Sequence, residues 1–360
     1  MINKDNRLYS LGLKESVFEE FQEFYGEYYL GRIIVEQKGL YKVATELCDI
    51  NAKVSGKLIF DGLQRSDYPA VGDWVVLDRD SNKSGEAIIH GIIKRSSKLC
   101  RKVAGVKSDE QIIGANLDKV FICMALNNDF NIRRLERYIT IVWDSGAVPV
   151  IVLTKADLCD ELDERMKEVE EISIGIDIFI ISSYTGEGVQ EIIHYVKERE
   201  TIAFIGSSGV GKSTLINALL GYEKQATKGV RQGDERGRHT TTHRELICIP
   251  SGGVVIDTPG MRELQLLNNT EGVDNSFKDI SDIATQCKFS DCSHKAEPGC
   301  AVLKAIEEGV ITEDRLESYF KLKKEAEYME RKVNKTAAIE HKKHWVKINK
   351  EMKKRPNKKV

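Results

Sequence analysis

Residues 202–219 read IAFIGSSGVGKSTLINAL, a short apolar run followed by a glycine-rich turn and the start of a helix. Residues 206–213 fit the pattern G-x-x-x-x-G-K-[ST] without deviation. The glycines permit a tight loop whose backbone N–H groups surround phosphate oxygens. Lys212 is expected to reach the β- and γ-phosphates, and the Ser213 hydroxyl to bind Mg²⁺. The stretch predicts a nucleoside triphosphate site formed by Gly206, Ser207, Ser208, Gly209, Val210, Gly211, Lys212, Ser213 and Thr214.

On both sides of this loop, apolar runs that are typical of buried strands alternate with helical patterns. The strand-like runs cover residues 120–124, 148–153, 178–181, 202–205 and 254–256. The helical patterns cover residues 131–143, with Asn131 as the N-cap, 160–172 and 189–197. The alternation predicts a mainly parallel sheet with helices on both faces. Ligands of such sheets bind beyond the carboxyl ends of the strands, where the phosphate loop lies.

The residues Thr154, Lys155, Ala156 and Asp157 directly follow one of these strands and predict which base is bound. A carboxylate at Asp157 can accept hydrogen bonds from guanine N1–H and the 2-amino group, whereas adenine presents an acceptor at N1. Because unpaired polar groups are costly, the site should select GTP over ATP. The aliphatic stem of Lys155 can pack along the base. Ser182 and Ser183, after the strand at 178–181, are expected to form a second loop that contacts guanine.

Residues 257–260 read DTPG and match the pattern D-x-x-G. Asp257 is expected to hold Mg²⁺ through water, and the Gly260 N–H to sense the γ-phosphate. Between this motif and the phosphate loop, residues 237–242 read GRHTTT. One threonine there should complete the Mg²⁺ shell; Thr241 is favoured, and Thr240 and Thr242 are the alternatives.

Met261 stands where many GTPases carry a glutamine that orients the attacking water. Because a thioether cannot orient water usefully, we expect slow intrinsic hydrolysis that requires a partner. His239 is the candidate for the catalytic role, with His243 and Arg238 as alternatives.

Three cysteines and a histidine cluster within fourteen residues, with the spacing C-x₄-C-x-H-x₅-C. Three thiolates and one imidazole suit a closed, tetrahedral, structural Zn²⁺ site rather than an open catalytic one. The expected ligands are Cys287, Cys292, His294 and Cys300. The other five cysteines are expected to be small buried hydrophobic residues: Cys48, Cys100, Cys123, Cys159 and Cys248.

The N-terminal third has a different pattern. Residues 1–29 are acidic, and Val17, Phe18, Phe21 and Phe24 recur at helical spacing, which predicts a short docking helix. Five short β-like runs follow, at residues 31–35, 40–44, 52–58, 73–77 and 87–93. Five strands in so short a segment predict a small barrel, either an OB-fold or an SH3-like barrel.

Composition excludes general disorder, because 41% of the residues are hydrophobic and 31% are charged. There is no apolar run of about 18 residues and no secretory signal, so we expect a soluble, cytoplasmic protein without a membrane partner. The net charge of −2 hides an asymmetry: residues 331–360 carry +10, and residues 1–330 carry −12. A basic tail on an acidic body predicts contact with a polyanion.

The motifs occur in an unusual order. The guanine loops precede the phosphate loop, the threonine stretch and D-x-x-G, which gives the order 4-5-1-2-3 in place of 1-2-3-4-5. This order resembles the circularly permuted GTPases. A barrel before it and a Cys/His cluster after it resemble one branch, the small-ribosomal-subunit-dependent GTPase A (RsgA) family, whose members carry the same metal arrangement.

The resemblance implies a GTPase, producing GDP and phosphate, that assists late maturation of the 30S ribosomal subunit and is stimulated by it. It further implies contact with 16S rRNA, one structural Zn²⁺, Mg²⁺ bound with GTP, a monomer, and a catalytic role for His239. Two alternatives stay open. One is a permuted GTPase that serves another ribonucleoprotein, such as the large subunit; the other is a nucleotide-gated RNA-binding module with incidental hydrolysis.

The predicted fold is multidomain α/β: an OB-like β-barrel, a circularly permuted P-loop GTPase domain and a zinc-binding helical domain. The expected segments are an extension over residues 1–29, the barrel over 30–100, the GTPase domain over 101–266, the zinc-binding domain over 267–330 and a basic helical tail over 331–360.

Overall fold

Six strands form the central sheet, in the order β10-β9-β8-β11-β13-β12. The computed structural model describes residues 6–37, 39–62, 64–81, 85–102, 110–223, 244–257 and 271–329. All neighbouring pairs in this sheet are parallel except β12 with β13. The strands are β8 (Lys119–Ala125), β9 (Val148–Thr154), β10 (Ile178–Ile180), β11 (Thr201–Ile205), β12 (Glu245–Cys248) and β13 (Val254–Asp257). The predicted parallel sheet is confirmed.

Helices cover both faces of this sheet, as the alternation predicted. Along β8, Ile122 packs in one apolar cluster and Phe121 in another. The first cluster includes residues of α4 (Ile132–Asp144) and α5 (Leu162–Ile172). The second includes residues of α6 (Val189–Tyr195) and α7 (Lys212–Leu220). Asn131 caps α4 as predicted, since its side chain accepts a hydrogen bond from the Arg134 N–H at 2.9 Å.

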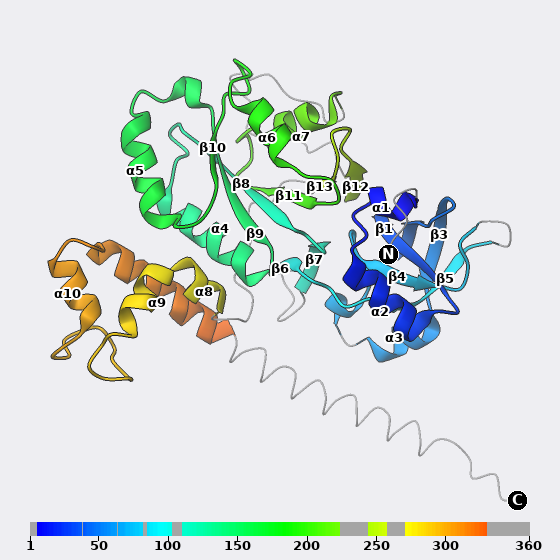
Figure 1. Cartoon of the computed structure of the whole chain (residues 1–360), viewed down its shortest axis with the longest axis horizontal. Helices are drawn as coiled ribbons and strands as arrows, with labels where there is room; N and C mark the ends of the chain where they lie inside the picture. The colour runs from blue at the N-terminus through cyan, green and yellow to red at the C-terminus, as the bar shows by residue number, and fades with distance from the viewer. Residues whose placement is uncertain are drawn as a thin grey trace, which may run out of the picture.

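The N-terminal part of the chain forms a closed five-stranded barrel (Figure 1). Its strands pair in the order β1-β2-β3-β5-β4, and β4 pairs back to β1, which is the Greek-key arrangement of an OB-fold. The strands are β1 (Tyr29–Gln37), β2 (Leu40–Ala44), β3 (Asp49–Val54), β4 (Trp74–Leu77) and β5 (Ala87–Ile92).

One predicted strand of the barrel is partly wrong. Residues 56–58 lie in the helix α3 (Gly56–Asp61), because the Ser55 hydroxyl accepts a hydrogen bond from the Leu58 N–H at 3.2 Å and so begins a helix there. A short 3₁₀ turn, η1 (Arg65–Asp67), follows before β4.

The barrel and the central sheet are joined along one edge, where β1 pairs with β12 through Val35 and Glu245. Arg32 of β1 is fully buried at this seam. Its guanidinium donates to the Thr201 hydroxyl of β11 at 2.9 Å, to the Gly72 carbonyl at 3.2 Å and to the Leu11 carbonyl. Burial lowers the pKa of Arg32 to about 10, so it stays charged at neutral pH. One side chain thus joins the barrel, the central sheet and the N-terminal extension.

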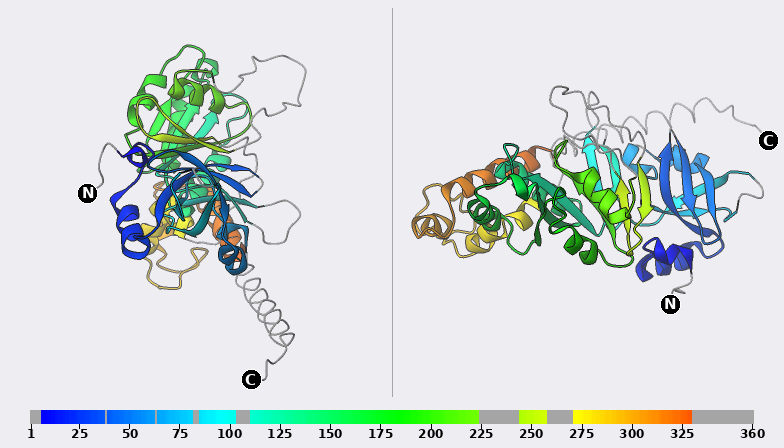
Figure 2. Two further views of the ribbon diagram at one scale, coloured as in Figure 1. Left: turned by 90° about the vertical axis from the view of Figure 1, so that its right-hand side faces the viewer. Right: turned by 90° about the horizontal axis from the view of Figure 1, so that it is seen from above.

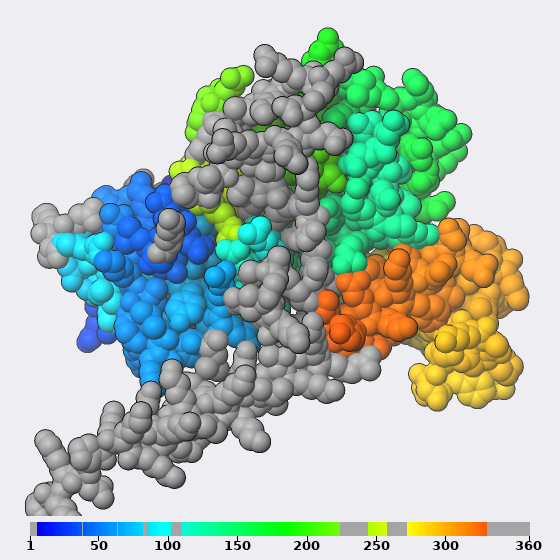
Figure 3. Space-filling model, turned by 180° about the vertical axis from the view of Figure 1, so that it is seen from behind, coloured from blue at the N-terminus to red at the C-terminus, as the bar shows by residue number. Residues whose placement is uncertain are grey.

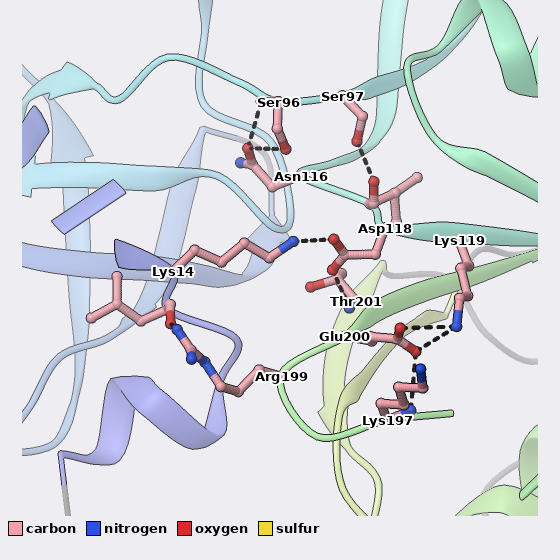
Figure 4. Close-up of polar contacts among 12 residues, drawn as sticks. Lys14, Ser96, Ser97, Asn116, Asp118, Lys119, Lys197, Arg199, Glu200 and Thr201 are labelled. Carbon is pink, nitrogen blue, oxygen red and sulfur yellow. Dashed lines mark hydrogen bonds and ion pairs between the residues drawn. The ribbon is translucent and has the colours of Figure 1, made fainter. Parts of the chain in front are cut away.

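The N-terminal extension forms the helices α1 (Arg7–Ser10) and α2 (Glu15–Tyr25), which confirms a helix there. Phe21 is buried as its spacing predicted, but Phe24 is 66% exposed, so its expected packing is wrong. The extension also lies across the seam, where Lys14 pairs with Asp118 and Arg199 donates to the Leu13 carbonyl (Figure 4).

A separate antiparallel hairpin, β6 (Lys98–Lys102) with β7 (Glu110–Ala115), connects the barrel to the central sheet. β6 runs through the boundary expected between residues 100 and 101. The boundaries expected after residues 266 and 330 lie outside the described residues. The domain boundaries stay predictions.

The C-terminal part is helical and lies at the opposite end of the molecule from the barrel (Figures 2 and 3). It contains α8 (Glu271–Ser276), α9 (Lys278–Ala284), α10 (Ala301–Glu307) and a helix over residues 313–329. Thr312 caps the last helix as predicted, accepting from the Arg315 N–H at 3.2 Å. The basic tail lies outside the described residues. Within the described part, no helix is both long enough and apolar enough to cross a membrane.

A buried ion-pair network attaches this C-terminal part to α4. Glu136 of α4 is 1% exposed, and its carboxylate accepts hydrogen bonds from Arg315 at 2.8 Å and from the Ser318 hydroxyl at 2.6 Å. The same Arg315 guanidinium binds Asp279 of α9 and lies 4.1 Å from the centroid of the Phe277 ring. Because the charges are desolvated and satisfy one another, the loss of one partner should strongly lower the free energy of unfolding.

We predict that Arg315→Ala lowers the stability of the C-terminal helices by about 3–5 kcal/mol, because it removes the buried cation that Glu136 and Asp279 share. The matched control is Arg137→Ala, which breaks a partly exposed pair with Glu325 and should cost about 1 kcal/mol or less. Urea denaturation and hydrogen exchange of residues 313–329 measure the difference. Equal effects of the two variants would contradict the prediction.

Candidate nucleotide and metal sites

The predicted nucleotide residues meet at one edge of the central sheet, because the carboxyl ends of its parallel strands lie together. Ala125 of β8 is in register with Thr154 of β9, and Ile122 of β8 with Ile205 of β11. The loops after β9, β10 and β11 and the end of β13 therefore converge, although the chain visits them in the permuted order.

The phosphate loop has the backbone conformation that its glycines predicted. Gly206, Gly209 and Gly211 have φ angles of 139°, 78° and 100°. A Cβ atom at Gly206 would lie 2.3 Å from the carbonyl oxygen of Cys123, so only glycine fits against β8 there. The loop leads directly into α7, whose first turn contains Lys212, Ser213 and Thr214. A helix N-terminus at this place favours phosphate binding.

The Lys212 ammonium lies within the loop. Its Nζ donates to the carbonyl oxygens of Gly206 at 2.7 Å and Ser207 at 2.6 Å. Burial lowers the pKa of Lys212, which means that the protein around it disfavours the charge. An anion bound in the loop would favour the charged form of Lys212, so the environment suits a phosphate ligand.

Thr154 takes a part that sequence reasoning missed. Its contact with the nucleotide stays a prediction; the residue is 1% exposed, and its hydroxyl donates to the Val210 carbonyl at 2.6 Å. This bond ties the guanine loop to the phosphate loop. Lys155 follows in the left-handed conformation with φ 59°, and Ala156 begins the 3₁₀ turn η3 (Ala156–Leu158).

Asp157 is exposed in that turn, and the Ser182 hydroxyl donates to its Oδ1 atom at 2.6 Å. Ser182 is buried and so holds the carboxylate in place. A Cβ atom added at Gly211 would lie 3.9 Å from Ser183 Oγ, which puts the second guanine loop beside the phosphate loop. The structure thus brings both guanine loops to the phosphate loop.

The predicted magnesium and catalytic residues are only partly described. Asp257 ends β13 and is 3% exposed. Gly260 and Met261 lie outside the described residues, as do Arg238, His239, His243 and the three threonines at 240–242. Their roles stay predictions.

The four predicted metal ligands converge, and their donor atoms lie within 4.8 Å of one another. His294 Nδ1 lies 3.6 Å from Cys287 Sγ and 3.4 Å from Cys300 Sγ, and the two sulfur atoms are 3.9 Å apart. A tetrahedral Zn²⁺ with ordinary Zn–S and Zn–N bonds gives S–N separations of about 3.5 Å and S–S separations of about 3.8 Å. The cluster, completed by Cys292, therefore has the dimensions of a zinc site and could hold one ion.

The protein around the cluster supports metal binding. Burial lowers the pKa of His294, which keeps the imidazole in the neutral form that binds metals. Burial opposes ionisation of Cys287, but hydrogen bonds from the Val302 and Ala301 N–H groups of α10 outweigh it and lower the pKa of this thiol.

Glu297 is a supporting residue that sequence reasoning missed. It accepts hydrogen bonds from the N–H groups of Ser293 at 3.0 Å, Lys295 at 3.0 Å and Ala296 at 3.1 Å. Its hydrogen bond from the Ser293 hydroxyl, followed by those from the backbone, lowers its pKa. The only signal in the sequence was a carboxylate placed between two metal ligands.

All eight cysteines lie within the described residues, and none is in a disulfide. Cys100 and Cys123 are buried as expected, and burial raises the pKa of each thiol to about 12. Cys48 and Cys159 are partly buried, whereas Cys248 is exposed, so the expectation for Cys248 is wrong. It is the last residue of β12.

Comparison with known proteins identifies the family. The RsgA GTPase profile matches residues 92–267, and a 50S ribosome-binding GTPase profile matches residues 201–350. Small ribosomal subunit biogenesis GTPase RsgA 2 of Lactiplantibacillus plantarum is 50% identical over 299 residues, covering 83% of this chain and 84% of that protein. This chain belongs to the RsgA family. RsgA 1 of Oceanobacillus iheyensis is 46% identical over 327 residues, covering 90% of this chain and 93% of that protein.

Two solved structures share the RsgA fold found here. YjeQ from Thermotoga maritima has a TM-score of 0.63 and 29% identity, covering 83% of this chain and 98% of that one. YloQ, a circularly permuted GTPase, has a TM-score of 0.60 and 26% identity, covering 84% and 96%. The predicted family, fold class and GTPase activity are therefore confirmed.

We predict that Asp157→Asn weakens GTP binding about 100-fold. The carboxylate offers two charged oxygen acceptors for guanine N1–H and the 2-amino group, whereas the amide has one neutral acceptor and places a donor beside the other guanine donor. Asp160→Asn, an exposed carboxyl three residues away, is the matched control and should bind GTP normally. Titration with a fluorescent GTP analogue measures both affinities. Normal GTP binding by the Asp157 variant would contradict the assignment.

Proposed function

We propose that this chain binds the 30S ribosomal subunit through its 16S rRNA, hydrolyses GTP in response, and so assists late subunit maturation. The observation that carries the proposal is the 50% identity over 299 residues to a protein named for small ribosomal subunit biogenesis. The charge pattern supports an RNA partner, since the 30 terminal residues carry +10. The OB-type barrel supports it as well, because such barrels commonly bind RNA.

In the proposed nucleotide complex, residues 206–214 hold the phosphates, and Asp157 holds guanine with the loop at Ser182 and Ser183. Ser213 and Asp257 bind Mg²⁺ together with Thr241, and the Gly260 N–H contacts the γ-phosphate. The Mg²⁺ ion neutralises charge that develops on the phosphate oxygens. Among the described residues, the phosphate loop, the loops at Asp157 and Ser182, and Asp257 at the end of β13 lie at one edge of the sheet.

We further propose that the Cys/His cluster holds one structural Zn²⁺, that the chain acts as a cytoplasmic monomer, and that the five predicted segments are its functional divisions. The zinc proposal rests on the tetrahedral separations around His294 Nδ1. A metal there would fix the loop between α9 and α10, because its four ligands cover that whole connection.

A second candidate partner is the large subunit. It is favoured by the match of residues 201–350 to a family described as 50S ribosome-binding GTPases. GTP hydrolysis measured alone, with purified 30S subunits and with purified 50S subunits separates the two. We expect at least tenfold stimulation by 30S subunits and none by 50S subunits; the reverse result would favour the second candidate, and no stimulation would leave a nucleotide-gated RNA-binding module.

We predict that His239→Ala lowers the 30S-stimulated kcat about 100-fold and leaves GTP affinity unchanged, because it removes the group that positions the attacking water. His243→Ala is the matched control and should retain stimulation. Single-turnover hydrolysis with saturating 30S subunits measures both. Full stimulated turnover by the His239 variant would refute its catalytic role.

We predict that the purified chain carries one Zn²⁺ and that Cys292→Ser removes it and loosens the loop between α9 and α10, because three ligands no longer close the tetrahedron. Cys248→Ser, which changes an exposed cysteine outside the cluster, should retain the metal. Native mass spectrometry and limited proteolysis are the measurements. A metal-free wild-type chain would show that the cluster is a set of reduced thiols.

A further inference from the structure

A groove of about 750 Å³ lies beside the connection between the barrel and the GTPase domain, and α8 of the C-terminal part also contributes to its lining. One wall is the connection from β5 to β6, which contributes Lys94, Ser96 and Lys98. The opposite wall is the end of α4, with Trp143 and Asp144, and α8 contributes Asn275. None of the nucleotide or metal residues described above lines this interdomain groove.

The two long walls are fastened to each other by backbone contacts. The Lys98 N–H donates to the Ser145 carbonyl at 2.9 Å. Gly146 follows with φ 83°, and a Cβ atom there would lie 3.1 Å from the Ser96 carbonyl oxygen. At the α8 side, a Cβ at Gly272 would lie 2.6 Å from Asp144 Cβ, so that helix also approaches α4 closely. The groove is therefore a fixed feature of the domain arrangement.

Asn116 holds the connection from β5 to β6 from below (Figure 4). It is 7% exposed and has φ 55°. Its Oδ1 accepts from the Ser96 N–H at 3.0 Å, and its Nδ2 donates to the Gly72 carbonyl of the barrel at 3.1 Å. The Ser97 hydroxyl donates to the Leu117 carbonyl at 2.6 Å. These bonds fix the wall that carries the lysines, so a ligand would bind a preorganised surface.

The polar groups of the groove favour an anion with an aromatic part. Lys94 and Lys98 are exposed, and within the described residues neither takes part in an ion pair, whereas Arg95 is committed to Asp73 at 2.7 Å. Trp143 is half-buried and lines the same groove. Asp144 is the one acidic residue of the lining. Two ammonium groups bind phosphates, an indole stacks on a base, and Asn275 and Ser96 can hydrogen-bond to base or sugar edges.

We propose that the interdomain groove binds one or two unpaired nucleotides of a single-stranded RNA segment, stacked on Trp143 with their phosphates on Lys94 and Lys98. The inference rests on the proposed function and adds to it a contact site for the RNA partner. An acidic peptide could bind the lysines but would leave the indole unused, so RNA fits the lining better. Because all three parts of the chain line the groove, an RNA bound there contacts them simultaneously.

The fluorescence of Trp143 reports directly on binding in the groove. The chain has three tryptophans. Trp74 is 2% exposed in the barrel. Trp345 belongs to the tail, and the experiment removes its fluorescence by the substitution Trp345→Phe. In full-length W345F, titration with a single-stranded oligouridine heptamer should quench the fluorescence of Trp143 through stacking. W143F in the same background should abolish the quenching and retain binding within about threefold, since a phenyl ring also stacks.

The role of Lys94 and Lys98 is tested by removing their charges. In W345F, Lys94→Ala with Lys98→Ala should weaken heptamer binding at least tenfold at low salt and reduce the salt slope by about 1.4, the value for two lost phosphate contacts on a single strand. The matched control is Lys167→Ala with Lys197→Ala, which removes the same charge from exposed lysines outside the groove. Thermal denaturation and GTP binding confirm that each variant is folded.

Absent quenching, or equal affinities of the groove and control variants, would overturn the inference. Quenching by an acidic peptide but not by the heptamer would also overturn it in favour of a protein partner. Failure of the proposed function is recognised separately, because the unaltered chain would then show no stimulation by 30S subunits. If stimulation is present and the groove variants respond as the control does, only the groove inference fails.

Discussion

The way in which the parts of this protein are held together depends on the buried carboxylate of Glu136 in α4. Glu136 is 1% exposed and is satisfied by Arg315 and Ser318, which lie on the C-terminal helix. The opposite side of α4 packs on the GTPase sheet, and Trp143 lines the interdomain groove. One helix therefore contacts the sheet, the C-terminal helices and the groove.

The circular permutation leaves the nucleotide edge intact because that edge is defined by strand register. β11 lies between β8 and β13, and the guanine loops precede it in the chain but lie beside it in space. The Thr154 hydroxyl joins the first guanine loop to the phosphate loop, because it donates a hydrogen bond to the Val210 carbonyl. The order of motifs along the chain can change freely as long as the new termini do not interrupt a strand.

Much of this could be predicted from sequence, because the motifs depend on local chemistry. The P-loop glycines, the Asn131 cap and the metal ligands each require a particular residue type within a few positions. Contacts between distant segments could not be predicted. Nothing in the local sequence marks Glu136 as a buried residue, because its partner Arg315 lies 179 residues away. Phe24 fitted a helical stripe but extends beyond the surface that α2 buries.

The pairing of β1 with β12 continues the barrel into the GTPase sheet. Glu245 is the register partner of Val35 on the barrel side and of Asp257 on the other side. A single row of three residues thus runs from the barrel to the carboxylate proposed to hold Mg²⁺. A displacement of the barrel would therefore reach the Asp257 carboxylate through strand pairing and not through a loop.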